Sequence, residues 1–267
     1  MTKRGRLIVI AVSIAILLSA FGLPVTAYGS QNSGQSNPGG YVKYTLDLVN
    51  NTLINGNFVN TGNALEPWGI AYDPSNGYIY VANYGSGTVS VINGKNNTVI
   101  ATIPVGSDPM GVAYDSSNGY IYVANWYSGT VSVINGTTVI ANILVVKGPE
   151  EGPGEVAYDP SNGYIYVTIY GSNLVSVING TTVIAYILVG KDPIGVAYDP
   201  SNGCIYVADD GSNTVSVING TTVIANIPVG IGPWGIAYDP SNGYIYVTNL
   251  VSGTVSIIFT GVSTSST

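Results

Sequence analysis

Short apolar runs separated by glycine, proline, asparagine and aspartate follow one another along most of the chain, and none of them has a helical period. In runs such as residues 78–81, tyrosine alternates with isoleucine or valine, which is the period of two that predicts a β-strand. Asp-Pro-Ser-Asn-Gly and Asn-Gly segments separate the runs, and both favour tight turns because proline fixes φ and glycine tolerates a positive φ. The pattern predicts an all-β protein of short antiparallel strands.

The pattern recurs five times along the chain. The phrase Tyr-Asp-(Pro/Ser)-Ser-Asn-Gly begins at residues 72, 114, 158, 198 and 238, at intervals of 40 to 44 residues. A complete copy contains four β-rich runs, and four antiparallel strands at this period describe a β-propeller blade. A β-solenoid would need a shorter coil, and a β-sandwich would not repeat its sequence. We therefore predict a β-propeller, most simply of five blades with four antiparallel strands each.

The two ends of the repeat region are incomplete. The last copy has three β-rich runs, the third at residues 254–259, whereas residues 44–49 and 52–59 resemble the third and fourth runs of a copy. We expect residues 52–59 to complete the last blade and so join the two ends. Twenty-one strands are one more than five blades need, so one strand is displaced to an edge or the ring closes imperfectly. Pairing of the half-blade with another chain is the alternative.

The repeated phrase carries a family resemblance. The segment from Pro67 through Trp68, Gly69 and Tyr72 to the motif at residues 80–83 resembles the YVTN family of β-propeller repeats of archaeal and bacterial exported and surface-layer proteins. Residues 122–125 and 246–249 also match the name-giving motif, whereas residues 166–169 and 206–209 depart at its last position. The resemblance covers about residues 44–260 and implies the fold. It implies little about function, because the repeat is a scaffold with many uses.

The N-terminus has the organisation of an export signal. Lys3, Arg4 and Arg6 precede an apolar run at residues 7–23, and small residues follow at Val25 and Ala27. This order predicts a signal peptide over residues 1–27, with an uncleaved membrane anchor as the alternative. Residues 28–40 are predicted to be a flexible linker, residues 41–260 the propeller and residues 261–267 a disordered tail. Either N-terminal outcome places the propeller outside the cytoplasm, in the medium or at the cell surface.

Composition restricts the chemistry that the chain can perform. Charged residues are 8% of the chain, and beyond residue 6 four lysines stand against 14 acidic residues, so a nucleic-acid partner is not expected. The chain has no histidine, which excludes a Ser-His-Asp triad and histidine-ligated zinc or haem. The single Cys204 stands where other copies have tyrosine, and we expect a small buried strand residue. The sequence predicts no catalytic residue and no resident cofactor.

One edge of the propeller is predicted to carry glycosylation sequons. The turns between the third and fourth strands of the copies contain Asn-x-Thr, and two of these turns keep the sequon without keeping Asn-Gly. Asn-Gly followed by threonine is also simply a good turn before a strand, so both interpretations stay open. The candidate glycosylation residues are Asn50, Asn96, Asn135, Asn179 and Asn219.

The opposite edge is the candidate binding face. It collects the loops between blades and the loops after the second strands, and with them all three tryptophans. Aromatic faces beside amides and carboxylates suit a sugar or a peptide, whereas tryptophans that fill the central channel are the alternative. The candidate binding residues are Trp68, Asn83, Tyr84, Asn125, Trp126, Tyr170, Asp209, Asp210, Trp234 and Asn249.

Copies three and four differ from the rest in their acidic residues on this face. Glu155 replaces a glycine of the other copies, and Asp192, Asp209 and Asp210 follow in the next copy. Such oxygens are weak candidates for a Ca²⁺ site, although no known loop spacing is present. The conserved phrase itself supplies aspartates that we expect to cap turns: Asp73, Asp115, Asp159, Asp199 and Asp239.

Three functions follow from these observations. The favoured one is a non-catalytic exported propeller that binds a surface protein or a carbohydrate at the cell envelope. A hydrolase or lactonase that uses the acidic residues of copies three and four is the catalytic alternative, since paired carboxylates can act without histidine. The third is self-association into a surface lattice through the spare strand, and the membrane is contacted only if the N-terminal segment is not cleaved.

Overall fold

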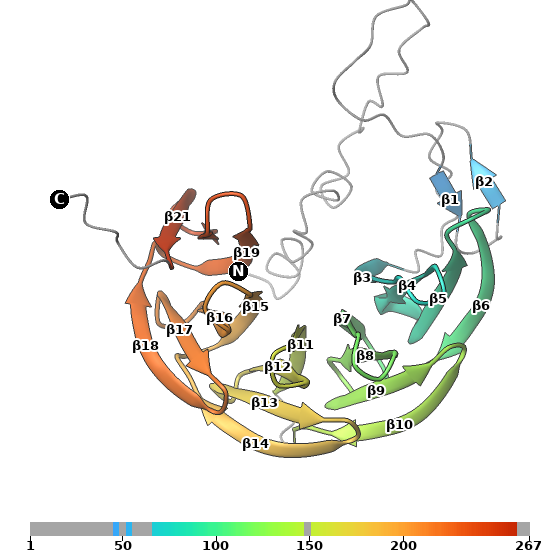
Figure 1. The fold of residues 1–267 in the computed structure, drawn as a ribbon, viewed down its shortest axis with the longest axis horizontal. Coiled ribbons are helices and arrows are strands. Elements are labelled where there is room, and N and C mark those ends of the chain that lie inside the picture. Colours follow the sequence, from blue (N-terminus) through green and yellow to red (C-terminus); the bar gives the residue numbers. More distant parts are fainter. Residues whose placement is uncertain (1–44, 48–51, 55–65, 147–150, 261–267) are drawn as a thin grey trace, which may run out of the picture.

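The structure is a computed structural model that describes residues 45–47, 52–54, 66–146 and 151–260. Five antiparallel sheets follow one another around an arc, each with its first strand at the centre and its last strand at the rim (Figure 1). The predicted all-β fold of five propeller blades is confirmed. The arc is open between the last blade and the first (Figure 1). No helix in the described ranges is long and apolar enough to cross a membrane.

The strand bounds follow the repeat. We number the blades in chain order, and blade 1 also holds a 3₁₀ turn, η3 (Tyr84–Ser86). Their strands are, in blade 1, β3 (Pro67–Asp73), β4 (Tyr78–Asn83), β5 (Thr88–Asn93) and β6 (Thr98–Pro104); in blade 2, β7 (Pro109–Asp115), β8 (Tyr120–Asn125), β9 (Thr130–Asn135) and β10 (Thr138–Leu144); in blade 3, β11 (Gly152–Asp159), β12 (Tyr164–Tyr170), β13 (Leu174–Asn179) and β14 (Thr182–Leu188); in blade 4, β15 (Pro193–Asp199), β16 (Cys204–Asp209), β17 (Thr214–Asn219) and β18 (Thr222–Pro228); and in blade 5, β19 (Pro233–Asp239), β20 (Tyr244–Asn249) and β21 (Thr254–Phe259).

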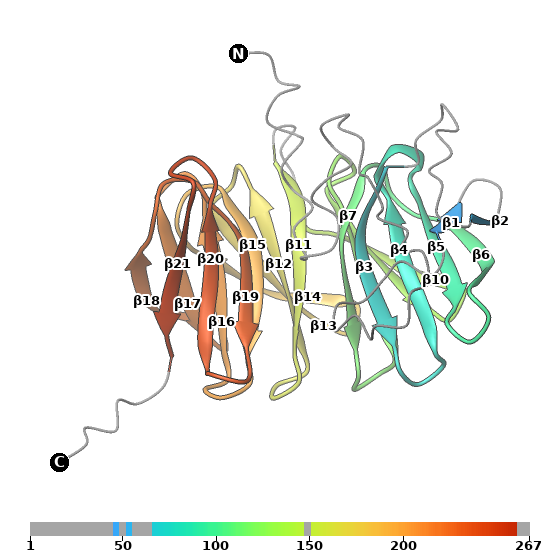
Figure 2. The same cartoon turned by 90° about the horizontal axis from the view of Figure 1, so that it is seen from above.

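The ends of the arc are built differently from its middle. Blade 5 has three strands in the described part of the chain. The N-terminal strands β1 (Thr45–Asp47) and β2 (Thr52–Ile54) pair with each other in a separate two-stranded sheet, which lies beside β6 of blade 1 (Figures 1 and 2). Residues 55–65 lie outside the described residues. Completion of blade 5 by an N-terminal strand therefore stays a prediction, as do the boundaries of the signal, linker and tail.

The Asp-x-Ser-Asn-Gly turns are closed by their own side chains. In blade 2, the Asp115 carboxylate accepts hydrogen bonds from the Ser117 amide (2.8 Å) and the Ser117 hydroxyl (2.6 Å), and its other oxygen accepts one from Asn118 (2.7 Å). Gly119 ends the turn at φ 77°, a conformation that residues with a Cβ rarely adopt. The Asp-to-Ser bonds recur in all five blades, so the aspartates cap turns as predicted.

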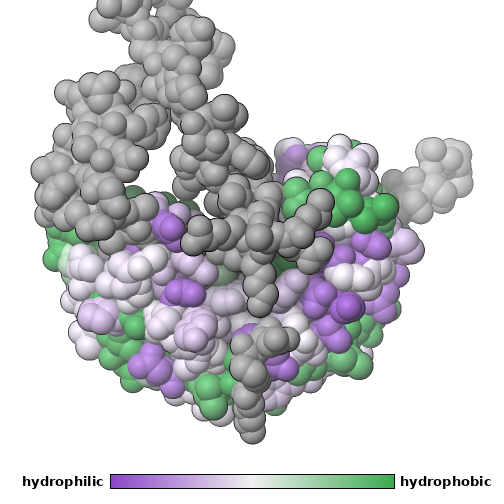
Figure 3. All heavy atoms as spheres, turned by 180° about the vertical axis from the view of Figure 1, so that it is seen from behind, coloured by the Kyte–Doolittle hydropathy of each residue, from purple (hydrophilic) through white to green (hydrophobic). Residues whose placement is uncertain are grey.

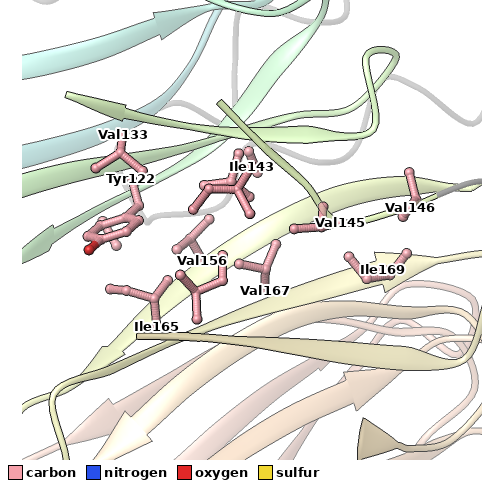
Figure 4. Packing of buried hydrophobic residues seen from close by; sticks show 13 residues of the cluster. Tyr122, Val133, Ile143, Val145, Val146, Val156, Ile165, Val167 and Ile169 are labelled. Atoms are coloured by element: carbon pink, nitrogen blue, oxygen red, sulfur yellow. The ribbon is translucent and has the colours of Figure 1, made fainter. Parts of the chain in front are cut away.

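The hydrophobic core lies between the blades. Tyr122 and Val133 of blade 2 pack against Ile165 and Val167 of blade 3, and all four side chains are fully buried (Figure 4). The same positions form the contacts between blades 1 and 2, 3 and 4, and 4 and 5. Burying one such side chain contributes about 1.5–3 kcal/mol. The alternation seen in the sequence therefore places tyrosine and valine on the face toward the next blade, and isoleucine and valine on the face toward the preceding one.

A tyrosine hydroxyl also joins each blade to the next in the middle of the arc. Tyr80, Tyr122 and Tyr166 each donate a hydrogen bond to a glycine carbonyl oxygen in the following blade's outer hairpin: to Gly136 (2.9 Å), Gly180 (2.9 Å) and Gly220 (2.8 Å), respectively. Polar tips of buried tyrosines are thus satisfied by the neighbouring blade. Cys204 is a buried strand residue, as predicted, and burial raises the pKa of its thiol.

Candidate functional site

Two kinds of loop meet along one edge of blades 1, 2, 4 and 5. The residue after the second strand donates a backbone hydrogen bond to the carbonyl oxygen of the residue before the first strand: Tyr84 to Glu66, Trp126 to Asp108, Asp210 to Asp192 and Leu250 to Gly232. The acceptor residues have positive φ values of 47°, 54°, 53° and 71°. Of these four acceptors only Gly232 is a glycine, so Glu66, Asp108 and Asp192 hold a backbone geometry that is uncommon for residues with a Cβ, although aspartate tolerates it better than most. Figure 2 shows the loops gathered at the edges of the arc.

Aromatic residues of this edge form two ring pairs over blades 1 to 3. The rings of Trp68 and Tyr84 lie 5.7 Å apart, and those of Trp126 and Tyr170 lie 5.4 Å apart. The Tyr84 hydroxyl hydrogen-bonds the carboxylate of Asp108, whose backbone oxygen accepts from Trp126. We call Trp68, Tyr84, Trp126 and Tyr170 the aromatic row. All four side chains are partly exposed, so the row offers ring surface to solvent.

Burial and the neighbouring carboxylates keep the Tyr84 hydroxyl of the row protonated by raising its pKa. Desolvation, followed by the negative charge of Asp108, raises the pKa of Tyr84 to about 12. The Tyr84 hydroxyl is therefore a neutral hydrogen-bond donor at any physiological pH. It is held by an acceptor from the next blade, which fixes the spacing between the two aromatic pairs.

Trp126 lies over glycines that the sequence analysis did not connect with it. A Cβ at Gly152 would lie 2.7 Å from its indole ring, and one at Gly154 would lie 3.9 Å from it. Gly154 occupies the repeat position that holds Trp68 and Trp234 in blades 1 and 5. The missing side chain in blade 3 leaves the space that Trp126 of blade 2 fills. A glycine at the tryptophan position of blade 3, together with a tryptophan at a different repeat position of blade 2, is the sequence feature that could have revealed this contact.

Trp68 and Trp234 are the second residues of the innermost strands β3 and β19, respectively. Each is partly exposed, but its indole nitrogen is buried and has no hydrogen-bond partner among the described residues. Trp68 belongs to the aromatic row, whereas Trp234 lies in blade 5 at the other end of the arc. The structure therefore does not bring all three tryptophans into one site.

The amides and the carboxylate that end the second strands do not face solvent. Asn125 is fully buried, and its Nδ2 donates to the hydroxyls of Thr130 (3.1 Å) and Ser132 (2.9 Å) on the third strand of its own blade. The sequence predicts that the residues at this position offer hydrogen bonds to a ligand at the binding face. The structure corrects this prediction, because all four of these side chains are buried: Asn83, Asn125, Asp209 and Asn249. They hold β-strands together within a blade.

Blades 3 and 4 depart from this arrangement in informative ways. Ile169 replaces the amide in blade 3, and the buried hydroxyl of Ser176 is left without a hydrogen-bond partner in the described structure. In blade 4 Asp209 stands in place of the asparagine, and the Thr214 and Ser216 hydroxyls donate to its carboxylate (3.1 and 2.7 Å). Hydroxyl groups can serve either partner because they both donate and accept.

The acidic residues of blades 3 and 4 do not converge. Among the described residues, no group of three or more aspartates, glutamates, cysteines or histidines could hold a metal ion, so Glu155, Asp192, Asp209 and Asp210 are not brought together as one. Burial raises the pKa of Asp209 to about 6 and that of Glu155 to about 7. Both values come from desolvation, which disfavours the charged carboxylate.

Four of the candidate glycosylation residues are accessible. Asn96, Asn135, Asn179 and Asn219 are exposed in the hairpins between the third and fourth strands. Asn50 lies outside the described residues. Three of these hairpins, those of Asn135, Asn179 and Asn219, also carry the glycine carbonyls that accept the tyrosine hydroxyls, so these turns have a packing role whether or not the asparagine is modified.

The sequence matches no known protein-family profile and no curated protein sequence. The fold is similar to that of several solved proteins. A streptogramin B lyase structure is 15% identical at a TM-score of 0.64, over 82% of this chain and 76% of that one. A catalytically inactive histidine-to-alanine variant of virginiamycin B lyase from Staphylococcus aureus, with quinupristin, is 12% identical at a TM-score of 0.62, over 82% and 78%. The WD40 β-propeller domain of Doa1 is 16% identical at a TM-score of 0.57, over 70% and 62%. At these identities the similarity shows the fold alone.

Proposed function

We propose that the chain is a non-catalytic, exported β-propeller of the YVTN type that binds a carbohydrate or a peptide at the cell surface through the aromatic row. The observation that carries the proposal is the row itself: two aromatic pairs, Trp68–Tyr84 and Trp126–Tyr170, span three blades with partly exposed rings. Flat rings in a line suit the apolar faces of successive sugar units or an extended peptide.

The chemistry of the described residues supports binding rather than catalysis. The chain has no histidine, and its four acidic candidates in blades 3 and 4 do not form a group. A single histidine-to-alanine change leaves virginiamycin B lyase catalytically inactive, so a chain without histidine does not share that activity by the same residue. The catalytic alternative would need paired carboxylates, and no observation here favours it.

Export rests on the N-terminal sequence, which lies outside the described residues. The basic start, the apolar run at residues 7–23 and the small residues that follow have the order of a signal peptide. A surface with few charges and four exposed sequon asparagines suits a glycosylated extracellular protein. Detection of the chain in the medium or on intact cells, with mass spectrometry of its N-terminus, tests this part.

A glycan and peptide array tests the binding. The wild-type chain is compared with Trp126→Ala and with Tyr127→Ala, a matched control because Tyr127 is the adjacent residue, is 79% exposed and lies outside the row. We expect Trp126→Ala to lose about two- to tenfold in affinity, since stacking on one ring is worth about 0.5–1.5 kcal/mol, and Tyr127→Ala to bind as wild type. Equal binding by both variants would refute the aromatic row as the site, and release of cleaved products would refute the non-catalytic proposal.

A further inference from the structure

Every contact between neighbouring blades has the same two halves. The forward face, toward the next blade, presents the two valines of the third strand and a tyrosine of the second strand. The backward face, toward the preceding blade, presents apolar residues of the first three strands. Between blades 1 and 2, the forward half includes Val89 and Val91, and the backward half includes Ile121 and Ile134. The chain builds this contact four times.

Blade 5 keeps the forward half but has no described blade in front of it. Val255 is 57% exposed and Ile257 is 61% exposed, whereas the equivalent valines of blades 1 to 4 are buried, with exposures of 0–4%. The next residue on this face, Phe259, is 54% exposed and packs edge-on against Tyr244. Figure 3 shows hydrophobic surface at this end of the arc, beside the C-terminal trace.

Blade 1 keeps the backward half in the same way. Ile70 and Tyr72 are 54% and 57% exposed. Ile79 is also partly exposed, whereas the four equivalent isoleucines, in blades 2 to 5, are all completely buried. The two ends of the arc are therefore the unmatched halves of one contact, and both border the gap between blade 5 and blade 1 (Figure 1).

The tyrosine hydrogen bonds between blades are unmatched in blade 1 and in the last two blades. The Tyr246 hydroxyl of blade 5 accepts from Asn242 (2.9 Å) but donates to no carbonyl in the described residues, unlike Tyr80, Tyr122 and Tyr166. The acceptor position, Gly136 in blade 2, is Gly94 in blade 1, and no described tyrosine donates to it. The Tyr206 hydroxyl of blade 4 likewise accepts from Asn202 (2.9 Å) and donates to no described carbonyl, so the unmatched donors lie in blades 4 and 5 and the unmatched acceptor lies in blade 1.

We propose that a second copy of this chain docks on these ends head to tail, with blade 5 of one copy against blade 1 of the next. Terminal repeats of arrays that end in solvent carry polar outer faces, because an exposed internal face would aggregate. Here both terminal blades keep the internal residues, and blade 5 adds Phe259 where the other blades have asparagine. The occupant that fits the forward face is a backward face, and the chain itself supplies one.

The contact is heterologous, because it joins two different surfaces. Such a contact generates a ring of copies if the rotation closes and a filament if it does not. The Tyr246 hydroxyl of one copy would face the outer hairpin of blade 1 in the next copy, whose turn at residues 94–97 is two residues longer than the turns that accept the three bonds inside the chain. The proposal is independent of the aromatic row, which lies along the loop edge of blades 1 to 3.

Two single-face variants test the geometry. Ile257→Asp places a charge on the forward face, and Tyr72→Asp places one on the backward face; both residues are exposed in a single copy, so each variant should fold. The matched control is Ile224→Asp, because Ile224 is 57% exposed on the outer strand β18 and belongs to neither face. The full-length chains are studied by light scattering coupled to size exclusion, with circular dichroism to verify folding.

We expect wild type and Ile224→Asp to form assemblies of two or more copies and each face variant to be monomeric. An equimolar mixture of the two face variants should then give a complex of twice the mass of one chain that grows no further, because each chain has one working face. A monomeric wild type, as when blade 5 closes onto blade 1 of its own chain, would overturn the proposal. So would a mixture that stays monomeric although the wild type assembles. If Ile257→Asp does not fold, Val255→Asp replaces it.

Discussion

The hydroxyl of Tyr122 in blade 2 donates a 2.9 Å hydrogen bond to the backbone carbonyl oxygen of Gly180 in blade 3. Two residues 58 positions apart are thereby joined through the outer hairpin of the neighbouring blade. Buried valines and isoleucines pack the sheets of blades 2 and 3 against each other, and this bond helps to align the two sheets.

Removing this hydroxyl should weaken the contact between blades. Tyr122→Phe keeps the ring but leaves the Gly180 oxygen without its donor, and we expect a loss of about 1 kcal/mol in the free energy of unfolding. Tyr206→Phe is the control, because Tyr206 also accepts from an asparagine of its own turn but donates to no described carbonyl. Urea unfolding measures both, and equal losses would show that the inter-blade bond contributes nothing.

Two serines at one repeat position should respond differently to the same change. Ser132 accepts from Asn125 and donates to Asn142 (2.7 Å), whereas the buried Ser176 hydroxyl has no partner in the described structure. We expect Ser132→Ala to cost about 1 kcal/mol and Ser176→Ala to be neutral or stabilising, because an unpaired buried hydroxyl is itself unfavourable. Thermal melts of the two variants compare them directly, and a larger loss for Ser176→Ala would contradict the assignment.

Stability should increase as the pH falls through about 6. Burial raises the pKa of Asp209 from 3.8 to about 6, so the folded chain binds this proton more tightly than the unfolded chain does. The effect develops below about pH 6, is complete below about pH 4 and amounts to at most about 3 kcal/mol. Asp209→Asn restores the amide of the other blades, and it should be more stable than wild type at pH 7.

The remaining pH dependence of Asp209→Asn should come from Glu155, whose pKa burial raises to about 7. Its sign is the same, since a raised carboxyl pKa also favours the folded state at lower pH. Unfolding free energies at several pH values, for wild type, Asp209→Asn and Asp209→Asn with Glu155→Gln, separate the two contributions. A slope that is unchanged by Asp209→Asn would contradict the burial of this carboxylate.

The position of Trp126 should depend on a glycine in the next blade. A Cβ at Gly152 would approach the indole ring to 2.7 Å, so Gly152→Ala should displace the ring and cost about 1–3 kcal/mol. Gly154→Ala is the milder control, since its Cβ would lie 3.9 Å from the same ring. Tryptophan fluorescence reports the displacement, and identical spectra for the two variants would show that Gly152 does not support the aromatic row.

The fold could be predicted from the sequence because each copy repeats both its strands and its turns. The alternation of tyrosine with isoleucine and valine gave the two blade faces, and the Asp-x-Ser-Asn-Gly phrase gave turns that the structure closes with its own side chains. The sequence left open whether the ring closes, because every local contact between blades is satisfied whether or not the ends meet.

The candidate site was harder to derive from the sequence. Alignment of the copies predicted that Trp68, Tyr84, Trp126 and Tyr170 share one edge, and the structure joins them in pairs. It did not distinguish these exposed rings from their immediate neighbours Asn83 and Asn125, which are buried. Successive residues of a strand point in opposite directions, so neighbouring residues at a strand end can differ in exposure. Asn125 points inward because it donates hydrogen bonds to Thr130 and Ser132, and these bonds are visible only in the structure.

The repeated contact between blades has a consequence for how such a gene can change. Because every blade carries the same two complementary faces, a recombination event that duplicates or removes one copy in frame, for example between the tyrosines Tyr158 and Tyr198, joins a forward face to a backward face as before. The product keeps its folded interfaces and changes only in length and curvature. Selection on the aromatic row and selection on the number of blades can therefore proceed separately.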